Sequence, residues 1–333
     1  MILKSAVTGG IARRVLLPAL IAVFVANISK VALQQIRLDR GACFMKRIGL
    51  YQSVCVLVAL VSLVAAFLPA TSEASTLYSA YDGQVRKYDT ADGTFLGEFF
   101  GYAYNGASIG VEGDIVYTGY DGTVRKYAAA DGSLLGDFFG YTYNGSKMLV
   151  SEGVLYSGYD GTIRRYDVKT GEMINEFFGY AYNGCSLAIS DGVIYSGYDG
   201  RVRKYDAADG TLLGDFFGYA YNGSSIGVED GIVYTGYDGT VRKYAAADGS
   251  FLGEFFGYTY NGSKVLVSEG VLYSGYDGTV RKYDVETGTN IGEFFGYAYN
   301  GSSLAIDAGP FVGGNDVVIS ADTNSNIIGD EGE

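Results

Sequence analysis

The residues of this chain that could do chemistry are mainly tyrosine, asparagine and aspartate, and they recur in two short motifs. Tyr-Asp-Gly first occurs at Tyr81, and Gly-Tyr-x-Tyr-Asn-Gly first occurs at Gly101. Aromatic rings stack on sugar rings, while Asn and Asp side chains hydrogen-bond to hydroxyl groups. The candidate ligand-binding residues are therefore the two tyrosines and the asparagine of each longer motif: Tyr102, Tyr104, Asn105, Tyr141, Tyr143, Asn144, Tyr180, Tyr182, Asn183, Tyr219, Tyr221, Asn222, Tyr258, Tyr260, Asn261, Tyr297, Tyr299 and Asn300.

The same residues also have a purely structural interpretation. Tyr102, Tyr104 and their equivalents would fill space between packed units, and Asn105 would only help to make a turn. The aspartate of Tyr-Asp-Gly, such as Asp82, either points toward a central cation or forms a hairpin turn, and we favour the turn. The pair at 86–87, Arg-Lys, and its copies are expected to form a solvated strand face paired with Asp and Glu.

Composition excludes several kinds of chemistry. The 333 residues contain no His, which excludes Ser-His-Asp and Cys-His catalysis and any His-ligated metal. Three Cys cannot build a disulfide framework, and Cys185, which replaces a Ser or Ala of the other repeats, is predicted to be an inert small residue rather than a nucleophile. Residues 1–74 hold 8 of the 24 basic but only 2 of the 37 acidic residues, so the remainder has a net charge of −19, which argues against nucleic-acid binding.

One unit of 39 residues, copied six times, must position the motifs. Tyr-Asp-Gly recurs with this spacing at Tyr81, Tyr120, Tyr159, Tyr198, Tyr237 and Tyr276. Segment 120–158 matches 237–275 at 36 of 39 positions, so a block of three units has been duplicated. A fixed period near 40 residues is typical of propellers, solenoids and arrays.

Each unit predicts four short strands separated by tight turns. In the unit that starts at Ser224, the predicted strands are Ser225–Val228, Ile232–Gly236, Thr240–Tyr244 and Phe251–Phe256. The Asp-Gly pairs between them supply the positive φ angles that hairpin turns need. Six such units predict an all-β fold, a six-bladed β-propeller of four-stranded antiparallel blades over 75–308.

The ends of the array predict how the ring closes. The array begins at Thr76 with a second strand that lacks its first, and it ends at 302–306 with a first strand that lacks its second. The strand at 302–306 is therefore expected to complete the blade that begins at Thr76, which removes open edges. In such a ring, the Tyr-Asp-Gly turns and the inter-blade connections share one face, which would carry six copies of the candidate residues.

The third unit reads Asp-Gly-Thr-Ile-Arg-Arg-Tyr-Asp-Val-Lys-Thr-Gly over Asp160–Gly171. It resembles the repeat of PQQ-like (quinoprotein-like, WD40-like) β-propellers, Asp-Gly-x-aliphatic-x-Ala-aliphatic-Asp-x-x-Thr-Gly followed by Trp, with Arg165 at the Ala position and Asn175 at the Trp position. The resemblance covers about 75–306 and implies a propeller fold. It also suggests a role like that of the exported, non-catalytic scaffolds of the family, which include an outer-membrane assembly factor.

The departures from this family also carry information. Quinone-binding members usually have eight blades, docking Trp residues, adjacent Cys residues in a disulfide and a calcium site. This chain has six units, no Trp and no Cys pair, so no cofactor is predicted. The docking role of Trp is expected to pass to the Phe-Phe pair, such as Phe177 and Phe178.

The N-terminal 74 residues resemble a targeting segment. A basic start at Met45, an apolar run from about Ile48 to Ala70, and small residues at Ser72 and Ala74 predict a signal peptide over 45–74 that is cleaved after Ala74; an uncleaved membrane anchor is the alternative. Residues 1–44 are expected to be an upstream extension that is not translated, and a two-helix membrane hairpin is the alternative.

The C-terminal segment, 309–333, departs from the repeat and is rich in acidic residues. Residues 322–333 match several ligand positions of an EF-hand loop, but Ile327 stands at the position that needs Gly. A flexible acidic tail without a metal is therefore the expectation.

Near-identical repeats argue against one specialised active site. The sequence predicts an exported, non-catalytic propeller, secreted or held in the periplasm or cell envelope, that binds a glycan or other polymer, or an envelope protein. Membrane contact is expected only through an uncleaved leader. The alternatives are a lyase or hydrolase with a single site in the propeller channel, and a purely architectural envelope component. Basic residues outside the common pattern, which an enzyme could use, are Lys147, Lys169, Arg201 and Lys264.

Overall fold

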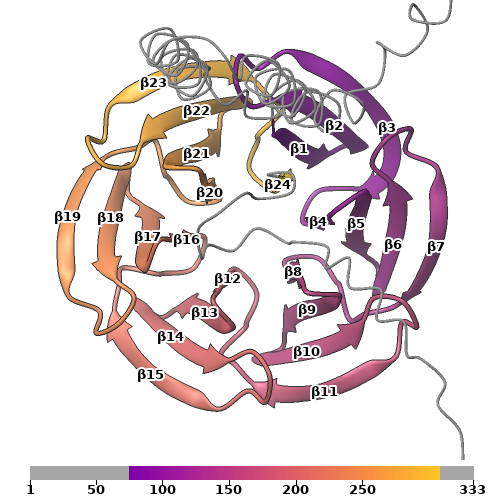
Figure 1. Ribbon diagram of the computed structural model, residues 1–333, viewed down its shortest axis with the longest axis horizontal. Helices are drawn as coiled ribbons and strands as arrows, with labels where there is room; N and C mark the ends of the chain where they lie inside the picture. Colours follow the sequence, from indigo (N-terminus) through magenta and orange to yellow (C-terminus); the bar gives the residue numbers. More distant parts are fainter. Residues whose placement is uncertain (1–74, 308–333) are drawn as a thin grey trace, which may run out of the picture. The chain divides into compact units, whose positions relative to one another are not determined.

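The computed structural model describes residues 75–307. Six four-stranded antiparallel sheets are arranged as blades around a central axis (Figure 1), which confirms the predicted six-bladed propeller. Residues 75–307 include no helix that is long and apolar enough to cross a membrane. The predictions for the extension at 1–44, the leader at 45–74 and the tail at 309–333 lie outside the described residues.

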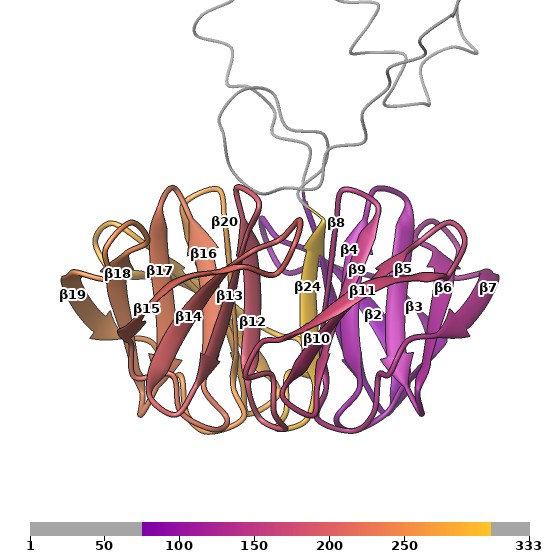
Figure 2. The same ribbon diagram turned by 90° about the horizontal axis from the view of Figure 1, so that it is seen from below.

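Every blade has the same strand order from the axis outward, and the blades are numbered here along the chain from the one that contains Thr76 (Figures 1 and 2). The inner strands, in blades 1 to 6, are β24 (Ser303–Asp307), β4 (Ser108–Glu112), β8 (Lys147–Ser151), β12 (Ser186–Ser190), β16 (Ser225–Glu229) and β20 (Lys264–Ser268). The second strands are β1 (Thr76–Tyr81), β5 (Ile115–Tyr120), β9 (Val154–Tyr159), β13 (Val193–Tyr198), β17 (Ile232–Tyr237) and β21 (Val271–Tyr276).

The two remaining layers lie farther from the axis. The third strands are β2 (Gly83–Asp89), β6 (Thr123–Ala128), β10 (Thr162–Asp167), β14 (Arg201–Asp206), β18 (Thr240–Ala245) and β22 (Thr279–Asp284). The outer strands are β3 (Phe95–Ala103), β7 (Leu134–Phe139), β11 (Met173–Phe178), β15 (Leu212–Phe217), β19 (Phe251–Phe256) and β23 (Asn290–Phe295). The strands predicted in the fifth unit therefore agree with the observed ones to within one residue at each end.

The tight turns form as their residue types predict. In the turn between β17 and β18, Asp238 has φ of 57° and Gly239 has φ of 77°. Two successive positive φ angles define the hairpin turn whose twist matches that of the flanking strands, and Asp-Gly tolerates them better than other residue pairs do.

The ring closes through the predicted strand exchange. β24, from the end of the array, pairs antiparallel with β1, with Thr76 opposite Asp307 and Ala80 opposite Ser303. Because blade 1 takes its inner strand from one end of the array and its other strands from the opposite end, opening the ring would break a ladder of backbone hydrogen bonds.

Successive blades dock through the first phenylalanine of each Phe-Phe pair. The ring of Phe216, in blade 4, lies 5.4 Å from that of Tyr244 in blade 5. A Cβ atom on Gly249 would lie only 2.3 Å from Phe216, so glycine lets the turn of blade 5 close over this ring. All six blades have the equivalent pair of rings, 5.3–5.9 Å apart. Phenylalanine therefore takes the predicted docking role of Trp.

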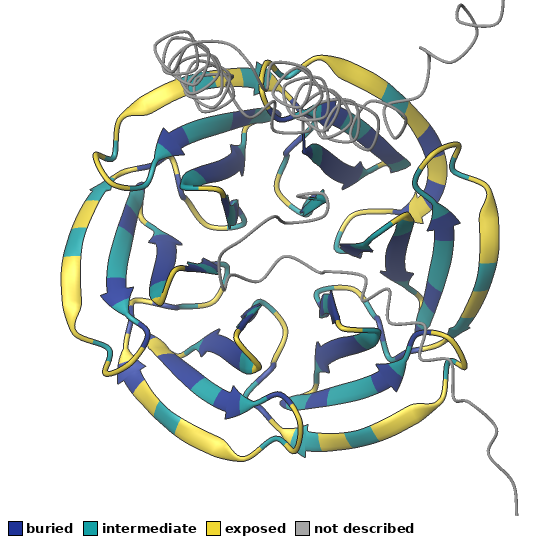
Figure 3. Ribbon diagram, viewed as in Figure 1, coloured by how far each residue is buried: buried dark blue, intermediate teal, exposed yellow. Residues whose placement is uncertain are grey.

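Only one member of each pair can dock, because successive side chains of a strand point to opposite faces. Phe217 is therefore half exposed, as are its equivalents. The outermost strand of every blade contains exposed stretches (Figure 3). In Phe177 and Phe178, the pair singled out in the sequence, Phe177 packs against Tyr205 while Phe178 stays on the surface.

The basic pair of the third strand corrects one expectation. Arg86 is buried rather than solvated, although its Nε does pair with Glu98 at 3.1 Å, as predicted. Lys87 reaches into blade 2, where its Nζ donates to the carbonyl oxygens of Ala129 and Ala130, both at 2.9 Å. These cations contribute to the interface between blades, because their side chains span it.

Candidate functional site

The end of each outer strand and the connection that follows it bring together three aromatic rings, which we call the aromatic cluster. In blade 1, the centroid of Phe100 lies 4.8 Å from that of Tyr102 and 6.4 Å from that of Tyr104, and the two tyrosines are 6.2 Å apart. In all six clusters the phenylalanine and the first tyrosine are 4.7–4.9 Å apart, and the two tyrosines are 6.1–6.3 Å apart. The structure therefore brings the predicted tyrosines together in each blade.

The phenylalanine of each cluster was not among the site residues predicted from the sequence. It is the most exposed of the three rings, between 49% and 57% exposed in the six blades. The alternation of side chains along a strand could have revealed it, since only the first residue of Phe-Phe can face the neighbouring blade.

Each cluster also packs against the next blade. The ring of Tyr104 lies 5.3 Å from that of Tyr120, and the guanidinium carbon of Arg125 lies 4.1 Å from the centre of the Tyr102 ring. These contacts agree with the interpretation that Tyr102 and Tyr104 fill space between neighbouring blades. Tyr102 and Tyr104 are nevertheless 40% and 39% exposed, so parts of both rings face solvent.

The first tyrosine of every cluster has an unfavourable backbone conformation. Tyr102 has φ of 52°, and the five equivalent tyrosines have φ between 49° and 53°. A bulky side chain rarely adopts this left-handed region, which costs about 1–3 kcal/mol per residue. Because Tyr102 packs against Phe100 and lies under Arg125, these contacts hold the strained geometry in place.

The asparagines lie at a different place, in a ring of turns around one mouth of the channel. The amide of Gly106 donates to the carbonyl of Gly301 at 2.9 Å, and the amide of Gly145 donates to that of Gly106 at 3.1 Å. A Cβ atom on Gly301 would lie 2.0 Å from Oδ1 of Asn105, so each asparagine covers the glycine of the preceding turn. The turn role predicted for Asn105 is thus part of the ring closure.

We expect alanine at the second tyrosine of the cluster to destabilise the fold. Tyr104→Ala, Tyr143→Ala and Tyr182→Ala each remove a ring that contacts the next blade, and each should lower the free energy of unfolding by about 1–2 kcal/mol. Urea unfolding measures the change, and Tyr104→Phe is the matched control because it keeps the ring. Equal stability of the Ala and Phe variants would contradict a packing role.

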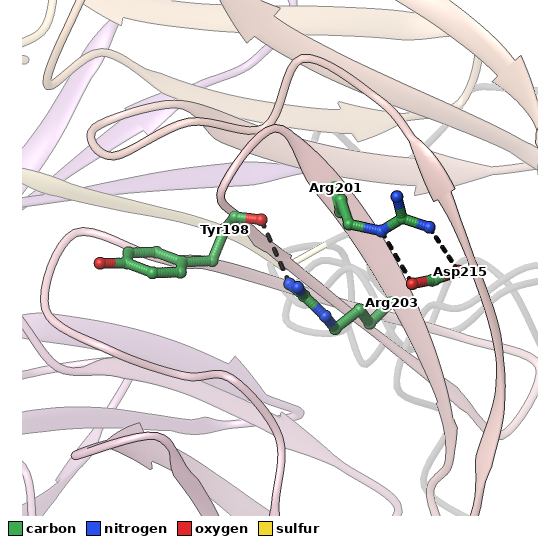
Figure 4. A network of polar contacts seen from close by, with 4 residues as sticks. All are labelled: Tyr198, Arg201, Arg203 and Asp215. Atoms are coloured by element: carbon green, nitrogen blue, oxygen red, sulfur yellow. Dashed lines mark hydrogen bonds and ion pairs between the residues drawn. The ribbon is translucent and has the colours of Figure 1, made fainter.

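The remaining sequence candidates lie outside the aromatic clusters. Asp82 occupies the first position of its hairpin turn, with φ of 56°, as predicted. Arg201 and Asp215 form a two-point ion pair on β14 and β15, with distances of 2.8 Å and 2.7 Å (Figure 4). Lys169 is exposed on a turn. Within residues 75–307, no group of three or more His, Cys, Asp or Glu side chains is placed to hold a metal ion.

Lys147 and Lys264 line the central channel, a cavity of about 220 Å³ bounded by all six inner strands. They occupy the first positions of β8 and β20, where the other four inner strands have serine. Burial lowers the pKa of both lysines. Nearby Cys185 is fully buried, and this burial raises the pKa of its thiol to about 12, so it stays protonated at neutral pH, consistent with an inert residue.

No protein-family model matches the chain, and no curated protein does. Among solved structures, the crystal structure of the computationally designed Ika8 protein is similar, with 22% sequence identity and a TM-score of 0.49 over 69% of this chain and 86% of that chain.

Proposed function

We propose that this propeller is an exported, non-catalytic binding module that holds a repetitive polymer, a glycan, through its six aromatic clusters. The observation that carries the proposal is the repetition of one exposed cluster in every blade, with the same ring distances each time. Six identical weak sites suit a ligand that is itself repetitive, because linked sites gain affinity through avidity.

The chemistry of the cluster supports a sugar ligand. Phe100 meets Tyr102 edge to face and is 49% exposed, so its ring offers apolar surface for contact with the apolar side of a sugar ring. The tyrosine hydroxyls add groups that both donate and accept hydrogen bonds. The PQQ-like resemblance of the repeat supports the non-catalytic part of the proposal by analogy, since that family includes exported scaffolds.

A second candidate ligand is an envelope protein. The outer strands expose apolar side chains at the end opposite the clusters, such as Leu134 and Leu135 in β7 and Leu212 in β15. Exposed apolar surface that recurs around a molecule is typical of protein-binding surfaces. This belt of outer-strand residues and the aromatic clusters can be mutated separately, so the two ligands can be distinguished.

The test is binding of the purified protein to a broad glycan array that includes isolated cell-wall polymers. We expect saturable binding to at least one polymer class and much weaker binding to its short fragments, since short fragments cannot engage several blades. Binding to no polymer at all would overturn the proposal and favour the protein partner.

A further inference from the structure

Two lysines line the same level of the central channel from opposite blades. Lys147 begins β8 in blade 3 and Lys264 begins β20 in blade 6, on opposite sides of the ring (Figure 1). The equivalent positions of the other blades are occupied by Ser108, Ser186, Ser225 and Ser303. One layer of the channel therefore contains two lysine side chains and four serine side chains.

Nothing in the described part of the protein neutralises the two lysines. Lys264 Nζ donates to the carbonyl oxygen of Gly262 at 3.4 Å, and no ion pair joins either lysine to an acid within residues 75–307. Asp307 is the one carboxylate among the described residues that line the channel, and it lies at the far end of β24, about 13 Å along the strand from the serine layer.

The protonation of one lysine disfavours the protonation of the other. Burial lowers the pKa of Lys264 well below its usual range, and the charge of Lys147 lowers it further. Two like charges held in a channel with aliphatic walls destabilise the free protein unless an anion accompanies them. The lysine pair thus lowers the stability of the folded protein, and a bound anion would offset this effect.

The serines of this layer differ in whether their hydroxyl protons are available, since Ser108 Oγ already donates to the carbonyl oxygen of Ser146 at 2.6 Å. Ser186 also belongs to the channel wall, but its Oγ is buried within the blade and has no hydrogen-bond partner. Ser225 Oγ accepts from the amide of Val265 at 2.8 Å, which leaves its own proton available. Deeper in the channel, Leu149 and Leu266 follow the lysines on the same strands and give the site an apolar wall.

We propose that this layer of the channel binds one small dianion, whose oxygen atoms accept hydrogen bonds from Lys147 and Lys264. A phosphate group and a short dicarboxylate share the required chemistry: two negative charges, several acceptor oxygens and a body small enough for a cavity of about 220 Å³. The site is separate from the aromatic clusters and does not depend on the polymer proposal. It also gives the blade-specific lysines a binding role that requires no reaction.

The test measures thermal unfolding of the full chain in rising concentrations of inorganic phosphate or malonate, with sodium chloride keeping the ionic strength constant. The Tm of the wild-type protein should rise by several degrees. At high dianion concentration the increase should follow the logarithm of that concentration, as expected for a ligand that binds at one site. Calorimetry should give one dianion per chain. Tighter binding of phosphate than of malonate would identify a phosphate group as the ligand, and the reverse order would identify a dicarboxylate.

The variants make the result specific to the channel. Lys147→Met and Lys264→Met should each weaken dianion binding by at least about tenfold, and the double variant should lose it. Without dianion, the double variant should melt above the wild type, because an unpaired pair of charges has been removed. Lys126→Met, whose Nζ donates outside the channel to Val168, is the control and should keep the shift. Absence of binding by the wild type, or unchanged binding by the double variant, would overturn the proposal.

Discussion

Removing the exposed phenylalanine of the aromatic cluster in three adjacent blades is expected to lower the affinity for a repetitive polymer by about 10- to 100-fold. The variant carries Phe139→Ala, Phe178→Ala and Phe217→Ala. Each change removes a ring that is about half exposed and is not the ring that docks on the next blade, so the fold should survive. Affinity for the polymer identified on the array, together with thermal unfolding, measures both effects.

The matched control carries Leu135→Ala, Ile174→Ala and Leu213→Ala. These side chains lie in the same three strands and are as exposed as the phenylalanines, at 53%, 48% and 51%, but they belong to the opposite end of each strand. The control should bind the polymer as the wild type does. Loss of binding by the control alone would place the ligand on the belt of outer-strand residues and contradict the assignment to the clusters.

The second large effect is expected where blades dock. Phe216→Ala should lower the free energy of unfolding by about 3–5 kcal/mol, because it opens a cavity beside Tyr244 and beneath the turn at Gly249. Phe217→Ala, one residue further along the strand, should lower it by no more than about 1 kcal/mol because the ring is already half exposed.

Urea unfolding of the two variants tests this contrast directly. The midpoint should move for Phe216→Ala with little change in the slope, since the surface exposed on unfolding is nearly the same. Similar losses for both variants would mean that the outward phenylalanine also supports the fold, and the cluster would then be a packing device rather than a site.

Much of the architecture could be predicted because the repeat is so regular. Asp-Gly turns at a fixed spacing limit each strand to about six residues, and the missing first strand before Thr76 indicates the closure with β24. Turns and strand alternation can be predicted in this way because they depend only on residues that are neighbours in the sequence.

What could not be predicted depends on contacts between blades. The burial of Arg86 and the reach of Lys87 into the next blade follow from the angle at which two sheets meet, which no residue spacing encodes. The positive φ of Tyr102 is equally hidden, because a tyrosine rarely adopts it and only tertiary contacts hold it there.

In the candidate sites, too, the sequence indicates the unusual or repeated residues, but only the folded structure shows which of them lie together. The sequence singled out Lys147 and Lys264 as departures from the pattern, but their place in one layer of the channel follows only from the closed ring. Likewise, the repeated tyrosines were evident, whereas the exposed phenylalanine beside them required knowing which face of the outer strand meets the neighbouring blade.

The most direct test of the multivalent account is the number of sites per chain. Equilibrium titration with a fragment of the bound polymer, too short to span two blades, should give about six equivalent sites per chain, one for each aromatic cluster. The variant that lacks three exposed phenylalanines should retain about three of them. A single site in the wild type would contradict the account, because one site cannot arise from six equal clusters.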